Sequence, residues 1–134
     1  MRPVVLDAAA AVEYLLQTPS APGIARIVED HTVDLHVPAL CDVEVTAALR
    51  RAVLQRRLPP ARAEAALGDY LDLPLRRHGH AALLPRILAL RDNFSAYDAC
   101  SAALAERLGA DLLTGDIALG LAVARHLALR VQHP

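Results

Sequence analysis

Lysine and tryptophan are absent from this chain of 134 residues, and phenylalanine and tyrosine together make up only 3% of it. So few aromatic rings argue against a surface on which successive single-stranded bases stack. All 14 basic residues are arginine and the formal net charge is −1, so the protein as a whole has no positive field to attract nucleic acid. An anionic substrate would have to be held by local groups of arginines or by a metal ion.

Long apolar runs are also absent, although 54% of the residues are hydrophobic. No stretch reaches the ~20 consecutive apolar residues of a membrane helix, and the first residues run directly into Asp7, which leaves no apolar signal peptide. Cys41 and Cys100 show neither a metal-binding nor a disulfide spacing, which fits a reducing compartment. We therefore expect a cytoplasmic protein without a membrane segment, folded as one domain over residues 1–134.

Short apolar runs that indicate strands alternate along the chain with helical patterns. Strands are expected at residues 4–6, 35–37, 112–114 and 127–131, with a short extended piece at 73–76. Helices are expected at residues 8–17, about 24–28, 40–57, 61–71, about 85–90, 96–108 and 117–126. Strands separated by helices predict an α/β fold with a parallel sheet covered on both faces.

Two of these helices bear on the functional argument. The helix at 96–108 begins after Ser95 in a capping-box pattern and ends at Gly109. The helix at 40–57 is expected to bury Leu40, Val43 and Ala47.

Acidic residues lie at the ends and beginnings of these elements, at Asp7, Glu44, Asp98 and Asp116. Asp7 and Asp116 each follow an apolar strand and lead straight into a helix, which is where parallel sheets form active sites. Asp98 lies in the first turn of its helix. Glu44 lies beside the apolar face of helix 40–57, where an unpaired charge would be costly. If the two strands are neighbours, these carboxylates can converge at one edge of the sheet.

Such a cluster of carboxylates would favour divalent cations. Two carboxylates about 4 Å apart repel each other by roughly 4 kcal/mol at an effective dielectric constant near 20, and coordination would offset that cost. Oxygen ligands select Mg²⁺ or Mn²⁺ rather than zinc. Metal ions held in this way activate a water and stabilise both oxygens of an in-line displacement at phosphorus. The sequence thus predicts hydrolysis of a phosphodiester.

Each acid also has a purely structural explanation. Asp7 and Asp116 could simply be helix N-caps, and Asp98 could belong only to the capping box. Glu44 would be a surface residue if its helix were rotated by one position. The argument for a site rests on the occurrence of all of these acids at compatible positions.

Several segments resemble the PIN-domain signature. They are Asn93-Phe94-Ser95-Ala96-Tyr97-Asp98-Ala99, the segment at residues 103–110 and Leu113-Thr114-Gly115-Asp116, preceded by residues 4–8 and 38–44. Within that family, the chain is most similar to the toxin component of VapBC toxin–antitoxin modules. This resemblance implies an α/β/α sandwich and an endoribonuclease that depends on Mg²⁺ or Mn²⁺. It also implies a homodimer that is inhibited by a small VapB-like antitoxin.

The resemblance assigns the catalytic and metal-site acids to Asp7, Glu44, Asp98 and Asp116, with Asp7 and Asp98 as the principal ligands. It also gives Thr114 a supporting role. Ser101 departs from the pattern, because many relatives carry a bulky tyrosine there. After Asp116, the apolar residues 117–119 stand where relatives commonly place charged ones, so a second metal ion would bind weakly.

Arginines near the expected site could contact RNA phosphates, and the candidates are Arg50, Arg51, Arg86 and Arg91. Alternatively, these arginines simply form solvent-exposed helix faces.

Two other functions are compatible with part of this evidence. One is a PIN-like nuclease of RNA processing without a toxin role, and the other is a non-catalytic α/β binding module. A receiver-like module usually needs a lysine near its acids, and this chain contains none.

Overall fold

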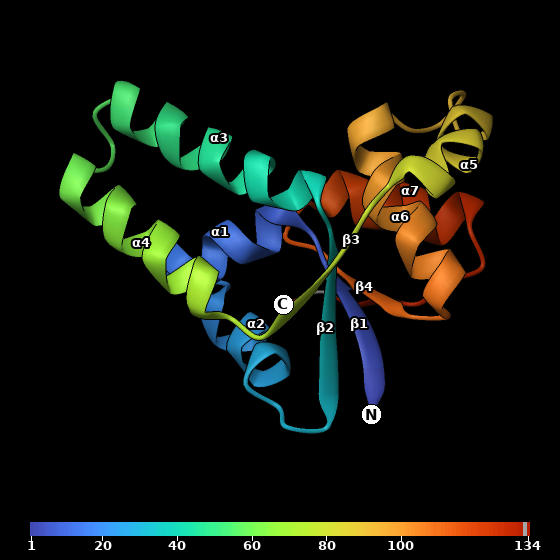
Figure 1. Cartoon of the computed structure of the whole chain (residues 1–134), viewed down its shortest axis with the longest axis horizontal. Coiled ribbons are helices and arrows are strands. Elements are labelled where there is room, and N and C mark those ends of the chain that lie inside the picture. The colour runs from blue at the N-terminus through green and yellow to red at the C-terminus, as the bar shows by residue number, and fades with distance from the viewer. Residues whose placement is uncertain (133) are drawn as a thin grey trace.

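A parallel five-stranded sheet forms the centre of the computed structural model, which describes residues 1–132 and 134 (Figure 1). The strands lie in the order β3-β2-β1-β4-β5, and every neighbouring pair is parallel. Their bounds are β1 Arg2–Leu6, β2 Val33–Pro38, β3 Leu75–His78, β4 Asp111–Leu113 and β5 Val131–Gln132.

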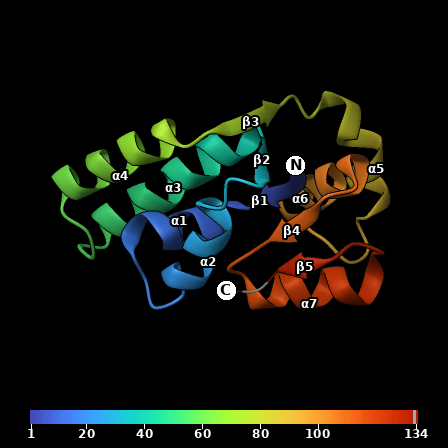
Figure 2. The same ribbon diagram turned by 90° about the horizontal axis from the view of Figure 1, so that it is seen from below.

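Helices cover both faces of this sheet, which confirms the predicted three-layer α/β/α sandwich. Helices α1 to α4 lie on one side of the sheet, and α5, α6 and α7 lie on the other (Figure 2). Their bounds are α1 Ala8–Leu16, α2 Ala21–Val28, α3 Leu40–Leu54, α4 Pro60–Asp72, α5 Leu84–Ala89, α6 Ala96–Leu108 and α7 Ile117–His126, with a short 3₁₀ turn at Ala81–Leu83. None of the helices among the described residues is long and apolar enough to cross a membrane.

The sheet separates two apolar cores. Val4 and Leu6 of β1 point into the core shared with α1 to α4, whereas Val5 between them points into the core shared with α5 to α7. All three side chains are fully buried. This alternation follows from the two-residue period of a strand, and it explains why a strand covered on both faces is apolar throughout.

The bounds of α6 and α7 agree with the prediction because local signals define them. The Ser95 hydroxyl accepts a hydrogen bond from the backbone N–H of Asp98 at 3.1 Å, which begins α6. Gly109 ends that helix with a φ of 61°, a left-handed conformation that glycine adopts without strain. Asp116 caps α7.

Helix α3 differs from the prediction in its end and in its buried face. It ends at Leu54 rather than at residue 57, and Arg56 adopts a left-handed φ of 58°. The buried face consists of Cys41, Val45, Leu49 and Ala52, while Val43 is 66% exposed. The sequence contains two overlapping apolar stripes, and packing against α1 and α4 selected the one that begins at Cys41.

Strands β3 and β5 are displaced from their predicted ranges. β3 begins at Leu75, one residue after Pro74, which has no N–H to donate to the sheet. The prediction of a strand at 127–131 is wrong except at Val131, because β5 consists only of Val131 and Gln132, which pair with β4. β4 itself has three residues, so its neighbour has few backbone groups to pair with.

The strand order brings the two predicted aspartates side by side. β1 lies between β2 and β4, and Leu6 pairs with Leu113. The chain therefore leaves β1 and β4 at the same edge of the sheet, where Asp7 and residues 114–116 follow. Connections diverge there, because β1 leads to β2 on one side while β4 lies on the other. Parallel sheets bind ligands at such a point.

Candidate active site

A pocket of about 340 Å³ lies at this edge of the sheet, between α1, α3, α6 and α7. All of the predicted site acids line it, although they come from four separate parts of the chain. The polar and aromatic lining consists of Asp7, Glu44, Arg51, Tyr97, Asp98, Ser101 and Asp116.

Asp7 is the most deeply buried of these acids, with only 5% of its surface exposed. Its Oδ1 accepts a hydrogen bond from the backbone N–H of Ala10 at 2.8 Å, and its Oδ2 accepts one from the Thr114 hydroxyl at 2.5 Å. Burial raises the pKa of Asp7 from 3.8 to about 6. The hydrogen bonds from Thr114, Ala10 and Gly115 oppose that rise, and the nearby charge of Asp116 adds to it.

Thr114 connects the ends of the two central strands. It is 1% exposed, and its hydroxyl donates to Asp7 while accepting the backbone N–H of Asp116 at 2.9 Å. Asp7 and Asp116 are thereby held in fixed relative positions by one side chain. The predicted supporting residue thus lies in direct contact with both acids.

Glu44 and Asp98 approach the pocket from opposite sides of the sheet, on α3 and α6. Burial raises the pKa of Glu44, and the charges of Asp7 and Asp98 raise it further. Burial also raises the pKa of Asp98, as does the charge of Asp116, whereas Ser95 lowers it. Each of these carboxyl groups therefore senses at least one of the others, as expected for acids around a common space.

The structural explanation as helix N-caps is correct for Asp7 and Asp116. Asp7 caps α1, and Asp116 caps α7 by accepting the backbone N–H of Leu119 at 3.1 Å. Capping does not exclude a second role, because each carboxylate has two oxygens with two lone pairs each. For Asp98, the capping hydrogen bond is made by its backbone N–H, so its carboxylate is not the capping group.

The carboxylates surround the pocket without closing on a single point. Within residues 1–132 and 134, no three histidine, cysteine, aspartate or glutamate side chains stand close enough together to hold one ion. In the same range, no ion pair neutralises any of the pocket acids. The lining offers oxygen donors and contains neither histidine nor cysteine. This donor set suits Mg²⁺ or Mn²⁺, since Mg²⁺ is usually held by one or two carboxylates and keeps several waters.

The arginines suggested for RNA contact lie in different places. Arg51 is exposed and lines the pocket, whereas Arg50 is exposed on α3 outside the lining. Arg86 binds Glu106 through two hydrogen bonds of 3.0 Å near the far end of α6. Arg91 donates to the carbonyl oxygen of Leu88 at 3.2 Å. Of these arginines, Arg51 is the one that the fold brings to the acids.

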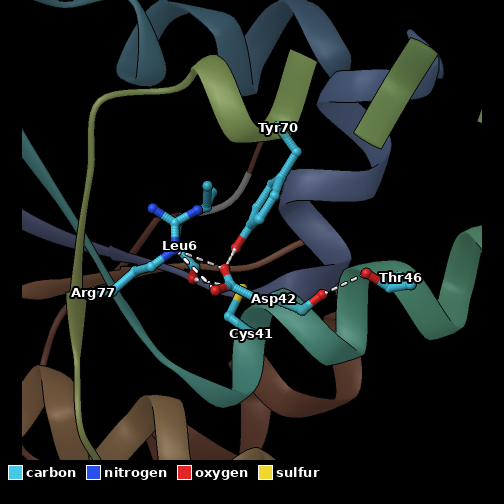
Figure 3. Close-up of polar contacts among 6 residues, drawn as sticks. All are labelled: Leu6, Cys41, Asp42, Thr46, Tyr70 and Arg77. Atoms are coloured by element: carbon cyan, nitrogen blue, oxygen red, sulfur yellow. Dashed lines mark hydrogen bonds and ion pairs between the residues drawn. The ribbon is translucent and has the colours of Figure 1, made fainter. Parts of the chain in front are cut away.

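A polar cluster that the sequence did not reveal fixes the beginning of α3 (Figure 3). Asp42 accepts a hydrogen bond from the Tyr70 hydroxyl at 2.7 Å and two from Arg77 Nε at 2.9 and 3.0 Å. On the same turn, the Cys41 thiol lies 4.0 Å from the carbonyl oxygen of Leu6, the residue before Asp7. The cluster connects α3 to α4, β3 and β1, and so positions Glu44 two residues further along.

The turn between Thr114 and Asp116 also depends on a close contact. A Cβ atom at Gly115 would overlap the carboxylate of Glu13 on α1. Glu13 Oε2 is buried and has no hydrogen-bond partner among the described residues. Gly115 therefore lets α1 pack directly beneath the turn that carries the site, and no sequence motif indicated this contact.

A second and larger hollow, of about 530 Å³, lies between α1, α2 and the end of α4. Its lining includes Glu29, Asp69 and Asp72 and contains no arginine. An anionic substrate would meet only negatively charged side chains there. This hollow also lacks the acids that follow β1 and β4, Asp7 and Asp116. The pocket at the carboxyl edge of the sheet is therefore the better candidate for the active site.

Comparisons with known proteins agree with the α/β/α fold described above. The family described as PIN domain matches residues 4–123. Ribonuclease VapC12 of Mycobacterium tuberculosis is 39% identical over 113 residues, which cover 84% of this chain and 86% of the relative. Ribonuclease VapC9 of the same organism is 38% identical over 116 residues, or 87% of each chain. The crystal structure of VapBC2 from Rickettsia felis, bound to a DNA fragment from its promoter, matches this chain with a TM-score of 0.70. The match covers 98% of both chains at 13% sequence identity, so it shows that the two share a fold.

Proposed function

Because the chain belongs to the PIN-domain family, we propose that it is an endoribonuclease that depends on Mg²⁺ or Mn²⁺ and acts as the toxin of a toxin–antitoxin pair. The observation that carries the proposal is the gathering of Asp7, Glu44, Asp98 and Asp116 around one pocket at the carboxyl ends of β1 and β4. Relatives that align with more than four-fifths of the chain are named VapC ribonucleases, which supports RNA as the substrate.

The donor chemistry of the pocket fits a hard divalent cation. Asp7 and Asp98 would be the principal ligands, with Glu44 and Asp116 holding a second ion or its waters. When bound, Mg²⁺ or Mn²⁺ supplies an activated water and stabilises the charge that develops on the phosphate oxygens.

The protein's own groups prepare this chemistry. Thr114 and the N–H of Ala10 hold the Asp7 carboxylate in one orientation, so its position needs no reorganisation when substrate binds. Glu44 and Asp98 approach from α3 and α6 and close the pocket on two sides. Arg51 provides a positive charge in a lining whose other charged residues are acidic, which suits it to a phosphate of the RNA backbone.

An RNA cleavage assay in Mg²⁺ or Mn²⁺ tests the enzymatic part of the proposal. Asp98→Asn should lose at least about a hundred-fold in kcat/KM, since it removes a proposed ligand while keeping the side-chain shape. Asp92→Asn is the matched control, because Asp92 is exposed on a neighbouring segment and does not line the pocket. Equal cleavage by Asp98→Asn and the native protein would refute the assignment of Asp98.

The toxin role requires a cellular test. Induced expression of the native chain alone should arrest bacterial growth, Asp98→Asn should not, and co-expression of a small VapB-like antitoxin should restore growth. A nuclease of RNA processing would cleave RNA in vitro but would not arrest growth. A non-catalytic binding module would do neither, and calorimetry would show no heat on addition of millimolar Mn²⁺.

A homodimer in the cytoplasm is part of the same proposal. Large apolar side chains are exposed at a spacing of four residues on two helices, at Leu84 and Leu88 of α5 and at Ile117 and Leu121 of α7. Such stripes on helix surfaces are suited to a partner. Sedimentation of native protein and Leu88→Arg tests this, because a native monomer would refute the homodimer and a dimer in both would refute the use of the α5 stripe.

A further inference from the structure

Tyr97 is an exposed aromatic side chain on the wall of the acidic pocket, and the mechanism described above does not use it. It is 64% exposed and lies in the first turn of α6, directly before Asp98. No hydrogen bond holds its hydroxyl within the part of the chain that the structure describes. The ring is therefore available to a ligand that enters the pocket.

The other phenylalanine and tyrosine side chains are committed to the structure. Phe94 is 8% exposed and Tyr70 is fully buried. The Tyr14 hydroxyl binds Glu29 at 3.0 Å, beside the other hollow. The scarcity of aromatic residues in the sequence argued against an extended stacking surface. The structure leaves one exposed ring, that of Tyr97, among the residues that line the pocket.

The surroundings of Tyr97 leave room for a planar group. Ser101 lies one turn further along α6, is 4% exposed and lines the same pocket with a small side chain. Asp98 follows Tyr97 in the chain and lines the same pocket, which Arg51 lines from α3. A phosphate held between Arg51 and a cation bound by the site acids would bring a neighbouring base toward the side of the pocket that Tyr97 lines.

We propose that Tyr97 is a substrate-positioning residue that stacks on the base of a nucleotide next to the scissile phosphate. This inference rests on the proposed ribonuclease function. Stacking requires an unpaired base, since a base inside a duplex already stacks on its neighbours. Tyr97 therefore selects single-stranded RNA at the cut and tolerates different bases, because every base presents a flat face.

Binding is measured first, without cleavage, in protein that carries Asp98→Asn. Single-stranded oligoribonucleotides with 2-aminopurine at successive positions are titrated with this parent and with versions that add Tyr97→Ala or Tyr97→Phe. Leu71→Ala is the matched control, because Leu71 is 62% exposed on α4 and does not line the pocket. Stacking by Tyr97 predicts quenching that is lost in Tyr97→Ala, with a dissociation constant between about five-fold and a hundred-fold weaker. Tyr97→Phe and Leu71→Ala should stay within about two-fold of the parent.

Cleavage by proteins that retain Asp98 separates this inference from the proposed function. Tyr97→Ala should raise KM for the single strand and be rescued by Tyr97→Phe, with unchanged thermal unfolding in both. If the native protein cleaves RNA but Tyr97→Ala leaves KM and quenching unchanged, the stacking role is overturned and the nuclease stands. If the native protein cleaves no RNA but quenching still depends on Tyr97, the nuclease proposal fails and the position beside a scissile phosphate is overturned with it, while Tyr97 is shown to bind single-stranded bases.

Discussion

Replacement of Asp7 by asparagine should stabilise the metal-free protein at neutral pH, even though it destroys a proposed catalytic group. The pKa of Asp7 is raised from 3.8 to about 6 because the carboxylate is buried. A folded state that binds a proton more tightly than the unfolded state loses stability as the pH rises through the interval between the two values. Asp7 therefore costs little stability near pH 4, and its full cost is present at pH 7.

The magnitude follows from that interval. The difference between about 6 and 3.8, at 1.36 kcal/mol per pH unit, gives roughly 3 kcal/mol at pH 7. Asparagine is as good an N-cap as aspartate, so the hydrogen bond from Ala10 is retained. Loss of the charged acceptor for Thr114 should subtract about 1 kcal/mol. Asp7→Asn should thus be about 2 kcal/mol more stable than the native protein at pH 7.

Urea unfolding monitored by circular dichroism, in EDTA at pH 4, 5, 6 and 7, provides the measurement. The difference in unfolding free energy between Asp7→Asn and the native protein should increase by roughly 2 to 3 kcal/mol from pH 4 to pH 7. Asp116→Asn is the control, because Asp116 is also an N-cap but is exposed, so its exchange removes no buried charge. A difference that does not change with pH, or an Asp7→Asn protein that is less stable at pH 7, would refute the reasoning.

Three further outcomes are expected. Mn²⁺ at about a hundred times its dissociation constant should stabilise the native protein by roughly 2.7 kcal/mol, seen as a higher melting temperature, and Asp98→Asn should lose most of that gain. Tyr70→Phe removes a partly buried hydrogen bond to Asp42 and should cost about 1 kcal/mol in urea unfolding, and an unchanged midpoint would show that the cluster does not hold α3. Gly115→Ala should cost only about 1 kcal/mol, because the Glu13 carboxylate that the new Cβ meets ends a flexible side chain and can move away. In a Glu13→Ala background the same change should cost almost nothing, so equal costs in a double-mutant cycle would refute the contact.

Much of the local structure could be predicted from the sequence, because local interactions decide it. Ser95 and Gly109 define α6 through hydrogen bonds and a backbone conformation within a few residues of each end. Asp7 and Asp116 are N-caps because a short acceptor after a strand satisfies the first N–H groups of a helix. The prediction was wrong at the buried face of α3, where two apolar stripes overlap, and at β5, where the three residues of β4 leave few backbone groups to pair with.

The sequence by itself thus determined the alternation of strands and helices, the α/β class, and the acids that stand at the ends of the elements. Only the tertiary structure decided that β1 and β4 are neighbours, so that Thr114 reaches Asp7 across 107 positions of sequence. It also decided that Arg51, rather than Arg86, faces the acids, and that Tyr97 is exposed beside them. The physical reason is that strand pairing and the burial of helix faces depend on packing between segments that are distant in sequence. The spacing of apolar residues within one segment does not indicate which other segment it packs against.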